Sequence, residues 1–233
     1  RRLAHEIKNP LTPIQLAIQQ LREKYAGHDP EFQKLLTQSS EVIEEEVEGL
    51  RRLTEEFSTF AKLPGVRTEA ADLNEYVSES LLGARLLGES AAGGVEIAWE
   101  PSAEPLPVSI DRLLFKRAID NLARNAVEAT AIKHPTGSGR VRIVTQADRA
   151  TGHALLRVID NGPGVPDGLR DAVFDPYVTT KEAGTGLGLA IVKKVVLEHG
   201  GTVAVRSTAE GAEFIIWLPL RAGAVAATAK VNP

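Results

Sequence analysis

The spacing of apolar residues over the first 63 positions most constrains the fold. Apolar side chains recur every three or four residues, as in a coiled-coil seam, over residues 1–25 and again over residues 31–63. Gly27-His28-Asp29-Pro30 separates the two stretches and predicts a turn. The expected seam residues are Leu3, Ile7, Leu11, Ile14, Ile18, Leu21 and Tyr25 in the first helix, and Leu36, Ile43, Val47, Leu50, Phe57 and Phe60 in the second. A single hairpin cannot bury this seam, so we expect a homodimer that completes a four-helix bundle.

The pattern changes after Leu63-Pro64-Gly65, where helix-breaking residues end the second helix. We expect a linker over residues 64–71 and an α/β sandwich over residues 72–220, so the whole chain is of the α+β class. Residues 221–233 are expected to be a disordered tail. The predicted helices are 72–87, 111–130 and 185–199, and the predicted strands are 95–100, 105–110, 140–147, 154–160, 202–207 and 213–218.

Two further details of this second region can be predicted. The buried stripe of the helix over 111–130 is expected to be Leu113, Leu114, Ala118, Ile119 and Leu122. On the strand over 154–160, the alternating positions Leu155, Arg157 and Ile159 are expected to share a face. Residues 161–184 are rich in Gly, Pro and Thr and are too long for an ordinary connection, so they predict a functional lid.

Composition excludes several classes of function. The net charge is −4, which argues against nucleic acid or an anionic membrane as the main partner. There is no cysteine, which excludes disulfides and fits a cytoplasmic location. No apolar run approaches the roughly 20 residues that span a bilayer. Since methionine is also absent, even at position 1, we expect a fragment of a longer protein whose anchoring in the inner membrane stays open.

The first helix carries a candidate nucleophile. His5 is followed directly by Glu6, and Asn9 lies one helical turn later on the same face as His5. Glu6 can hold the proton on one imidazole nitrogen, which leaves the other nitrogen as a nucleophilic lone pair. A zinc-protease motif would need a second histidine where Asn9 stands, so that interpretation fails. An exposed helical histidine of no special function is the alternative for His5 taken alone.

The second region carries a row of polar residues on one helix. Asn121, Asn125 and Glu128 lie at i, i+4 and i+7, opposite the apolar stripe. A row of side-chain oxygens suits a hard cation such as Mg²⁺. Ordinary surface polarity is the alternative.

A second motif follows an apolar strand. Asp160-Asn-Gly162-Pro-Gly164 offers a carboxylate that can accept a hydrogen bond from the exocyclic amino group of adenine, and its glycines let the backbone approach a flat ring. The same residues are also suited to a simple turn.

The third and fourth motifs suit phosphate. Phe174-Asp-Pro-Tyr177-Val-Thr-Thr180-Lys181 combines aromatic anchors with hydroxyl and ammonium donors. Gly184-Thr-Gly186-Leu187-Gly188 opens a helix, whose free N–H groups favour phosphate. It is not a dinucleotide fingerprint, because Leu189 stands where the third glycine is needed.

These four motifs in this order resemble the N box, first glycine box, F box and second glycine box of the Bergerat (GHKL) ATP-binding fold. His-Glu-x-x-Asn-Pro-Leu resembles the phospho-acceptor box of sensor histidine kinases. The run His5-Glu-Ile-Lys-Asn-Pro-Leu-Thr-Pro-Ile-Gln-Leu16 is most similar to their nitrogen-regulation, NtrY-like type. The resemblance covers residues 1–220.

The resemblance implies an ATP-dependent histidine autokinase. It implies that His5 accepts the phosphoryl group, that Glu6 is its acid/base partner, and that the group then passes to an aspartate of a response regulator. Asn9 matches the position that orients water for dephosphorylating that regulator. In the nucleotide site it implies Asn125 as the Mg²⁺ ligand and Asp160 as the adenine reader. The other implied ATP-binding residues are Asn121, Gly162, Gly164, Tyr177, Thr180, Lys181, Gly184, Gly186, Leu187 and Gly188.

Two rival functions stay open at this point. An ATPase clamp of the same fold would need a water-activating carboxylate near the N box, where Glu128 stands in place of the lysine of many family members. A nucleotide-binding scaffold without catalysis is the other. The His5 box argues against the first and the intact motifs against the second.

Overall fold

The computed structural model describes residues 2–25, 27, 29–61, 65–91, 93–181 and 184–221. Within its helices, the side chains of residues 2–10, 24, 52, 53 and 55–61 lie outside the described part. The chain divides into two compact units, residues 1–63 with 179–187, and residues 64–178 with 188–233. Of the predicted disordered tail, residues 221–233, Arg221 is described and its N–H donates to the Pro107 carbonyl at 2.8 Å, whereas residues 222–233 lie outside the described residues. Among the described residues, no helix is long and apolar enough to cross a bilayer.

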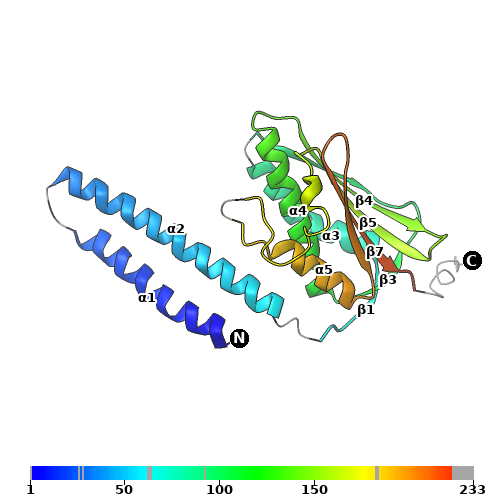
Figure 1. Ribbon diagram of the computed structural model, residues 1–233, viewed down its shortest axis with the longest axis horizontal. Coiled ribbons are helices and arrows are strands. Elements are labelled where there is room, and N and C mark those ends of the chain that lie inside the picture. Colours follow the sequence, from blue (N-terminus) through cyan, green and yellow to red (C-terminus); the bar gives the residue numbers. More distant parts are fainter. Residues whose placement is uncertain are drawn as a thin grey trace, which may run out of the picture. The chain divides into compact units, whose positions relative to one another are not determined.

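The first unit contains the predicted helical hairpin (Figure 1). Helix α1 runs over Arg2–Lys24 and helix α2 over Pro30–Ala61, side by side and antiparallel. The Asp29 carboxylate starts α2, since its Oδ1 accepts hydrogen bonds from the N–H groups of Glu31 at 3.0 Å and Phe32 at 3.2 Å. The two helices were therefore predicted correctly, and Asp29 caps the second one as expected.

One hairpin covers only part of its apolar seam. Leu11 and Val47 are buried, with exposed fractions of 5% and 4%. Ile14, Leu21 and Leu50, predicted on the same seam, remain 44–57% exposed within a single chain. The side chains of Leu3, Ile7, Phe57 and Phe60 lie outside the described part.

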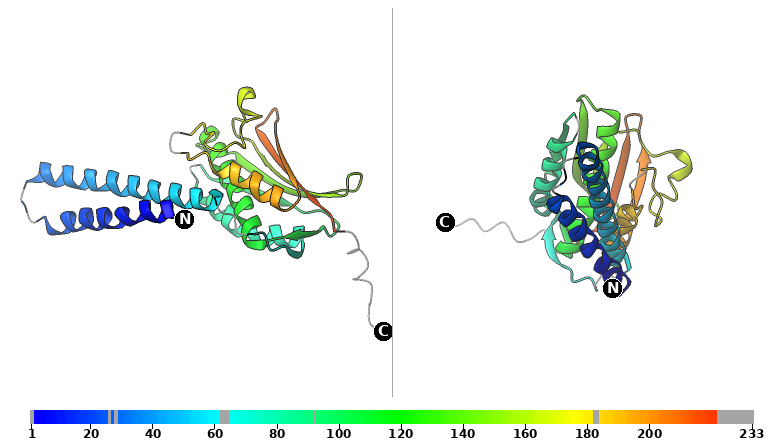
Figure 2. Two further views of the ribbon diagram at one scale, coloured as in Figure 1. Left: turned by 60° about the horizontal axis from the view of Figure 1, so that its bottom comes forward. Right: turned by 90° about the vertical axis from the view of Figure 1, so that its left-hand side faces the viewer.

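The second unit is built on a five-stranded sheet (Figure 2). Its strand order is β2-β4-β5-β7-β6; β2 and β4 are parallel, and the other pairs are antiparallel. Helices α3, α4 and α5 cover one face of this sheet. The bounds are α3 Leu73–Ser90, α4 Arg112–Lys133, α5 Gly188–Glu198, β2 Val95–Glu100, β4 Gly139–Asp148, β5 His153–Asp160, β6 Thr202–Ser207 and β7 Ala212–Pro219, with a short 3₁₀ turn at Asp167–Leu169. This is the predicted α/β sandwich, so the α+β class is confirmed.

A small second sheet was missed in the sequence. Strand β1, Glu69–Asp72, pairs antiparallel with β3, Pro107–Ile110, so that Glu69 lies opposite Ile110. Residues 69–71 fall within the predicted linker, and Glu-Ala-Ala-Asp has no β-branched or aromatic residue that would indicate a strand. Pairing with β3, rather than local propensity, makes this segment a strand.

One prediction about the buried stripe of α4 was wrong. Leu113, placed on the buried stripe of α4, is 65% exposed, whereas Leu114 and Phe115 are buried. It lies in the first turn of α4, beyond the edge of the apolar stripe. On β5, Leu155, Arg157 and Ile159 share a face as predicted. The alternate residues Leu156, Val158 and Asp160 are buried and lie on the helix-covered face. Asp160 therefore lies on the same side of the sheet as α4.

Helix α5, predicted over residues 185–199, begins later than predicted. Helix α5 starts at Gly188 rather than at Thr185. Gly186 has φ of +67°, a left-handed conformation that no regular helix accepts, and the Leu187 N–H donates to the Thr185 side chain at 3.3 Å. The glycine motif is thus a turn that precedes the helix.

Candidate functional site

The predicted phospho-acceptor residues lie within helix α1. His5, Glu6 and Asn9 belong to the segment Arg2–Lys24, so His5 and Asn9 are separated by one helical turn. Their side chains lie outside the described part of the structure. Their roles therefore stay predictions.

Helix α4 is fixed at its start by a network around Asp111. Asp111 Oδ1 accepts a hydrogen bond from the Leu114 N–H at 3.1 Å, and Oδ2 accepts from the Arg67 N–H at 3.0 Å. Burial alone would raise the pKa of Asp111, but these backbone donors outweigh it and lower the pKa. The Asp111 N–H donates to Nε2 of His199, whose Nδ1–H donates to the Val195 carbonyl at 2.7 Å. The network therefore joins α4 to the end of α5.

The amide side chains predicted to bind Mg²⁺ and ATP lie on α4. Asn121 and Asn125 are half-buried, whereas Glu128 is exposed. A Cβ added at Gly188 would lie 3.3 Å from Asn121 Oδ1 and 3.9 Å from Asn125 Nδ2. The first residue of α5 thus approaches the polar face of α4, and a side chain at Gly188 would crowd the Asn121 amide and contact that of Asn125.

Asp160 is the most constrained of the predicted site residues. Its exposed fraction is 4%, and its Oδ1 accepts hydrogen bonds from the N–H groups of Gly162 at 2.9 Å and Ala212 at 3.2 Å. Burial raises the pKa of the Asp160 carboxyl, and the two backbone donors and the Lys133 charge lower it in part. Neither backbone bond uses Oδ2, so this oxygen can accept a hydrogen bond from an amino group.

Glycines bring the backbone close to this carboxylate. A Cβ at Gly162 would lie 2.9 Å from Asp160 Oδ1 and 3.0 Å from the Ala129 carbonyl carbon of α4. Gly164 has φ of +80°, which a residue with a side chain rarely adopts. The predicted adenine motif is therefore packed against α4 one turn after Asn125, and the structure brings Asn125, Asp160 and Gly162 together in one unit.

The sequence did not indicate the turn between β6 and β7 as part of this site. Gly211 lies so close to Asp160 that a Cβ there would be 2.2 Å from the Asp160 carbonyl oxygen, and Ala212 donates to the carboxylate. The only local signal is a glycine beside a small residue at the start of a strand, which is ordinary turn chemistry.

The segment after the 3₁₀ turn is anchored by an aromatic pair. Phe174 is 8% exposed and makes an edge-to-face contact with Phe214 of β7, with ring centroids 6.2 Å apart. Tyr177, three residues later, is 64% exposed and has φ of +69°. A left-handed tyrosine is strained by about 1–2 kcal/mol. The predicted lid thus has one buried anchor followed by an exposed, strained residue.

The predicted phosphate-binding residues fall in the segment 179–187. Within it, the Lys181 N–H donates to Thr179 Oγ1 at 3.1 Å, and the Gly184 N–H donates to the Lys181 carbonyl at 3.1 Å. A Cβ at Gly184 would lie 2.4 Å from Thr179 Oγ1, so a side chain there would have to displace this hydroxyl. Thr180 is exposed and Leu187 is fully buried.

No cluster of three acidic, His or Cys side chains that could hold a metal exists among the described residues. Asn125 offers one amide oxygen, which fits the way Mg²⁺ binds with one or two protein ligands and substrate phosphates rather than in an all-protein cage. The residues present therefore fit a Mg²⁺ that arrives with a nucleotide.

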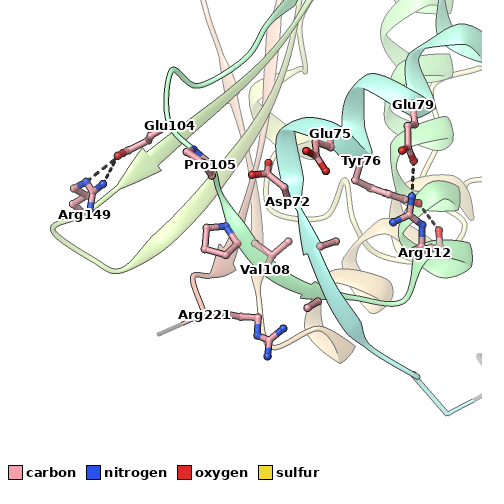
Figure 3. A pocket seen from close by; sticks show the side chains of 13 residues that line it. Asp72, Glu75, Tyr76, Glu79, Glu104, Pro105, Val108, Arg112, Arg149 and Arg221 are labelled. Carbon is pink, nitrogen blue, oxygen red and sulfur yellow. Dashed lines mark hydrogen bonds and ion pairs between the residues drawn. The ribbon is translucent and has the colours of Figure 1, made fainter. Parts of the chain in front are cut away.

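A cavity of about 600 Å³ lies elsewhere, between β1, β3 and the start of α3 (Figure 3). Its charged residues are mostly paired: Arg112 with Glu79 at 2.5 Å, and Arg149 with Glu104. None of the predicted site residues lines it.

Two family models match the sequence. The His Kinase A (phospho-acceptor) domain matches residues 1–65, and the histidine kinase-, DNA gyrase B- and HSP90-like ATPase matches residues 110–222. The structure of the mycobacterial sensor histidine kinase MprB is 35% identical, with a TM-score of 0.55, over 66% of this chain and 99% of that one. The chain belongs to the sensor histidine kinases. The resemblance inferred from the His5 box and the four nucleotide motifs is thereby confirmed.

The relatives support the predicted subtype. The nitrogen regulation protein NtrY of Azorhizobium caulinodans is 37% identical over 223 residues, which are 95% of this chain and 28% of NtrY. The chain spans only 28–41% of the length of the first curated relatives of this histidine kinase.

Two further solved structures carry ligands or partners. Full-length ShkA in complex with AMPPNP has a TM-score of 0.72 and 26% identity, over 94% of this chain and 45% of ShkA. The histidine kinase ThkA in complex with the response regulator TrrA has a TM-score of 0.65 and 28% identity, over 94% of this chain and 60% of ThkA.

Proposed function

We propose that this chain is the catalytic core of a histidine autokinase that transfers the γ-phosphoryl group of ATP to His5. The observation that carries the proposal is that one chain combines a His-Glu-x-x-Asn box on the helix of a hairpin with a buried carboxylate, Asp160, beside the N-box helix α4. An ATPase clamp or a scaffold needs only the second of these.

Asp160 is proposed to select adenine. A buried carboxylate whose Oδ1 is held by two backbone N–H groups presents its other oxygen in a fixed direction. An adenine amino group can donate to that oxygen, whereas a guanine carbonyl at the same ring position cannot. The binding of AMPPNP by ShkA supports a nucleotide as the ligand.

The phosphates are proposed to lie toward Thr180, Lys181 and the turn at residues 184–188. The hydroxyl of Thr180, the ammonium of Lys181 and the N–H groups at the start of α5 are suited to bind anionic oxygens. Asn125, with Asn121 beside it, is proposed to hold Mg²⁺. When bound, that ion would neutralise charge on the phosphates.

The chemistry proposed at His5 is an in-line displacement. The unprotonated imidazole nitrogen forms a bond to the γ-phosphorus, the bond from that phosphorus to the β–γ bridging oxygen breaks, and ADP leaves. Glu6 holds the proton on the other ring nitrogen and accepts it in part as positive charge develops on the ring.

The phosphoryl group is then proposed to move to an aspartate of a response regulator. The complex of ThkA with TrrA supports a regulator of this class as the partner. Asn9 is proposed to hold a water that hydrolyses the aspartyl phosphate, which would make the chain a phosphatase of the same regulator. The exposed seam residues Ile14, Leu21 and Leu50 support a homodimer through the hairpin.

The chemistry of the phosphorylated residue tests the proposal. The chain is incubated with Mg²⁺ and ATP that carries radioactive phosphorus at the γ position. A label on the protein that is lost in acid and stable in base is phosphohistidine and is the expected result. Release of free phosphate without protein label would favour an ATPase, in which Glu128 would be the first candidate for activating water. If neither labelled protein nor free phosphate forms, the result would favour a scaffold without catalysis.

A further inference from the structure

The ammonium group of Lys133 joins two loops that are far apart in the sequence. Lys133 lies in the last turn of α4, and its Nζ donates to the Gly162 carbonyl at 2.9 Å and to the Glu210 carbonyl at 2.8 Å. The first carbonyl belongs to the Asp160-Asn-Gly162 motif and the second to the turn between β6 and β7. One side chain therefore bridges the two sides of the loop pair around Asp160.

The residues in or next to these two loops also supply the N–H groups to Asp160. Gly162, whose carbonyl is bound by Lys133, donates its own N–H to Asp160 Oδ1 at 2.9 Å. Ala212, two residues after Glu210, donates to the same oxygen at 3.2 Å. Lys133 thus binds a carbonyl of each loop, while N–H groups in or next to the same loops bind the Asp160 carboxylate.

The neighbouring residue reinforces this contact. His134 Nε2 lies 3.0 Å from the Asn161 carbonyl, and because a carbonyl only accepts, Nε2 carries the proton and donates it. Nδ1 of His134 can then accept from Ser138 Oγ, at 3.3 Å. Two consecutive side chains at the end of α4 therefore hold two consecutive carbonyls, those of Asn161 and Gly162.

We propose that Lys133 is a positioning residue for nucleotide recognition: it holds the Gly162 and Glu210 loops so that Asp160 is presented to the adenine ring at a fixed distance from the N-box residues of α4. The proposal rests on the proposed function for its ligand, ATP. The positive charge of Lys133 also lowers the pKa of the buried Asp160 carboxyl, which favours the ionised acceptor.

The alternative for Lys133 is a general electrostatic role, in which its charge only complements the helix dipole. A cation in the last turn of a helix is favourable without any defined partner. Such a role predicts no change in the two loops or in base selectivity when the ammonium is removed, so it can be separated from positioning by experiment.

The test compares Lys133→Met with Lys116→Met in the whole 233-residue chain. Lys116 lies on the same helix, and its ammonium binds both carboxylate oxygens of Asp120, at 2.7 and 2.9 Å. The first readout is amide hydrogen exchange without nucleotide. In Lys133→Met, exchange at Gly162 and Ala212 should accelerate about tenfold, the loss expected for a charge-assisted hydrogen bond. In Lys116→Met it should stay unchanged.

The second readout is nucleotide affinity. The dissociation constant for ATP should rise about tenfold in Lys133→Met, and the preference for ATP over GTP should shrink; Lys133→Arg, which keeps the donors, should recover part of both. If Lys133→Met does not fold, Lys133→Gln is measured instead, since its shorter amide cannot reach both carbonyls. Wild-type exchange rates and wild-type ATP affinity in a folded variant would overturn the proposal.

The proposed function and the role of Lys133 can be contradicted independently of each other. Absence of ATP binding by the wild-type chain would contradict the proposed function, while the exchange readout would still test the loop contacts. Unchanged ATP binding and exchange in the Lys133 variant, with normal binding by the wild type, would contradict only the role of Lys133.

Discussion

The Asp160 carboxylate and the Ala212 N–H lie 3.2 Å apart although 52 residues separate them along the chain. The contact brings the turn before β7 against the end of β5, the neighbouring strand. A buried carboxylate bound in this way has one oxygen committed to the protein and one available to a ligand. We therefore expect the Asp160 carboxylate to lower the stability of the fold while it increases the affinity for ATP.

Asp160→Asn tests these two opposite effects. The amide oxygen of asparagine can still accept from Gly162 and Ala212, and the charge buried without a full partner is removed, so the free energy of unfolding should not fall. Affinity for ATP should fall by roughly 10–100-fold, the value of a hydrogen bond to a charged group. Thermal unfolding and calorimetric titration with ATP measure the two effects. Equal affinity of the wild type for ATP and GTP would contradict the assignment.

The pH profile supplies the control for this variant. Because burial raises the pKa of Asp160 above the ordinary value of about 3.9, the folded state binds more protons than the unfolded state between these two pKa values. The contribution of Asp160 to stability therefore increases as the pH falls through that window, while ATP affinity decreases because the protonated acid is a poorer acceptor. Asp160→Asn should lose both dependences.

Gly211→Ala should disrupt the site through the backbone. The added Cβ would lie 2.2 Å from the Asp160 carbonyl oxygen, closer than packed atoms allow, so the turn must move away from Asp160. We expect a loss of about 1–3 kcal/mol in the free energy of unfolding and a clear loss of ATP binding. Gly168→Ala is the matched control, since a Cβ there meets nothing within 4 Å. Normal ATP binding by folded Gly211→Ala would show that this turn is not part of the site.

The exposed seam of the hairpin leads to a prediction about assembly. Leu21 is 57% exposed within one chain, and a second copy would bury it. Full burial of such a side chain stabilises an assembly by about 1.5–3 kcal/mol. Leu21→Glu should therefore shift the chain from dimer to monomer in sedimentation experiments. Leu82→Glu, at a 69% exposed position of α3, should leave the dimer intact. A wild-type monomer at micromolar concentration would contradict the proposed bundle.

The sequence predicted those parts of the fold in which local pattern and tertiary packing agree. Both hairpin helices, α4 and the bounds of β2 followed from apolar spacing, and the order of the motifs led to the family. Strand β1 was missed because Glu69–Asp72 becomes extended only through pairing with β3. The contributions of Gly211, Ala212 and Lys133 were missed because they act through backbone atoms brought together by the sheet, which no spacing in the sequence records.

Asn9→Ala tests the second activity proposed for the His5 helix. The side-chain amide of Asn9 can donate and accept, so it can hold a water for attack on an aspartyl phosphate, whereas autophosphorylation needs no such water. We expect labelling of His5 to stay largely intact, while dephosphorylation of the regulator slows by roughly 10²-fold. Both rates are measured on the same variant. A parallel decrease in the two would mean that Asn9 maintains the shape of the helix rather than a water.

The most direct test of the central claim is the phosphorylation of wild-type and His5→Gln chains with γ-labelled ATP, with ATP affinity measured on the same preparations. His5 lies outside the unit that contains Asp160 and α4, so the substitution should leave ATP affinity nearly unchanged. The account predicts acid-labile label on the wild type and none on His5→Gln. Label retained by His5→Gln, or a large loss of its ATP binding, would contradict the assignment of His5 as the phospho-acceptor.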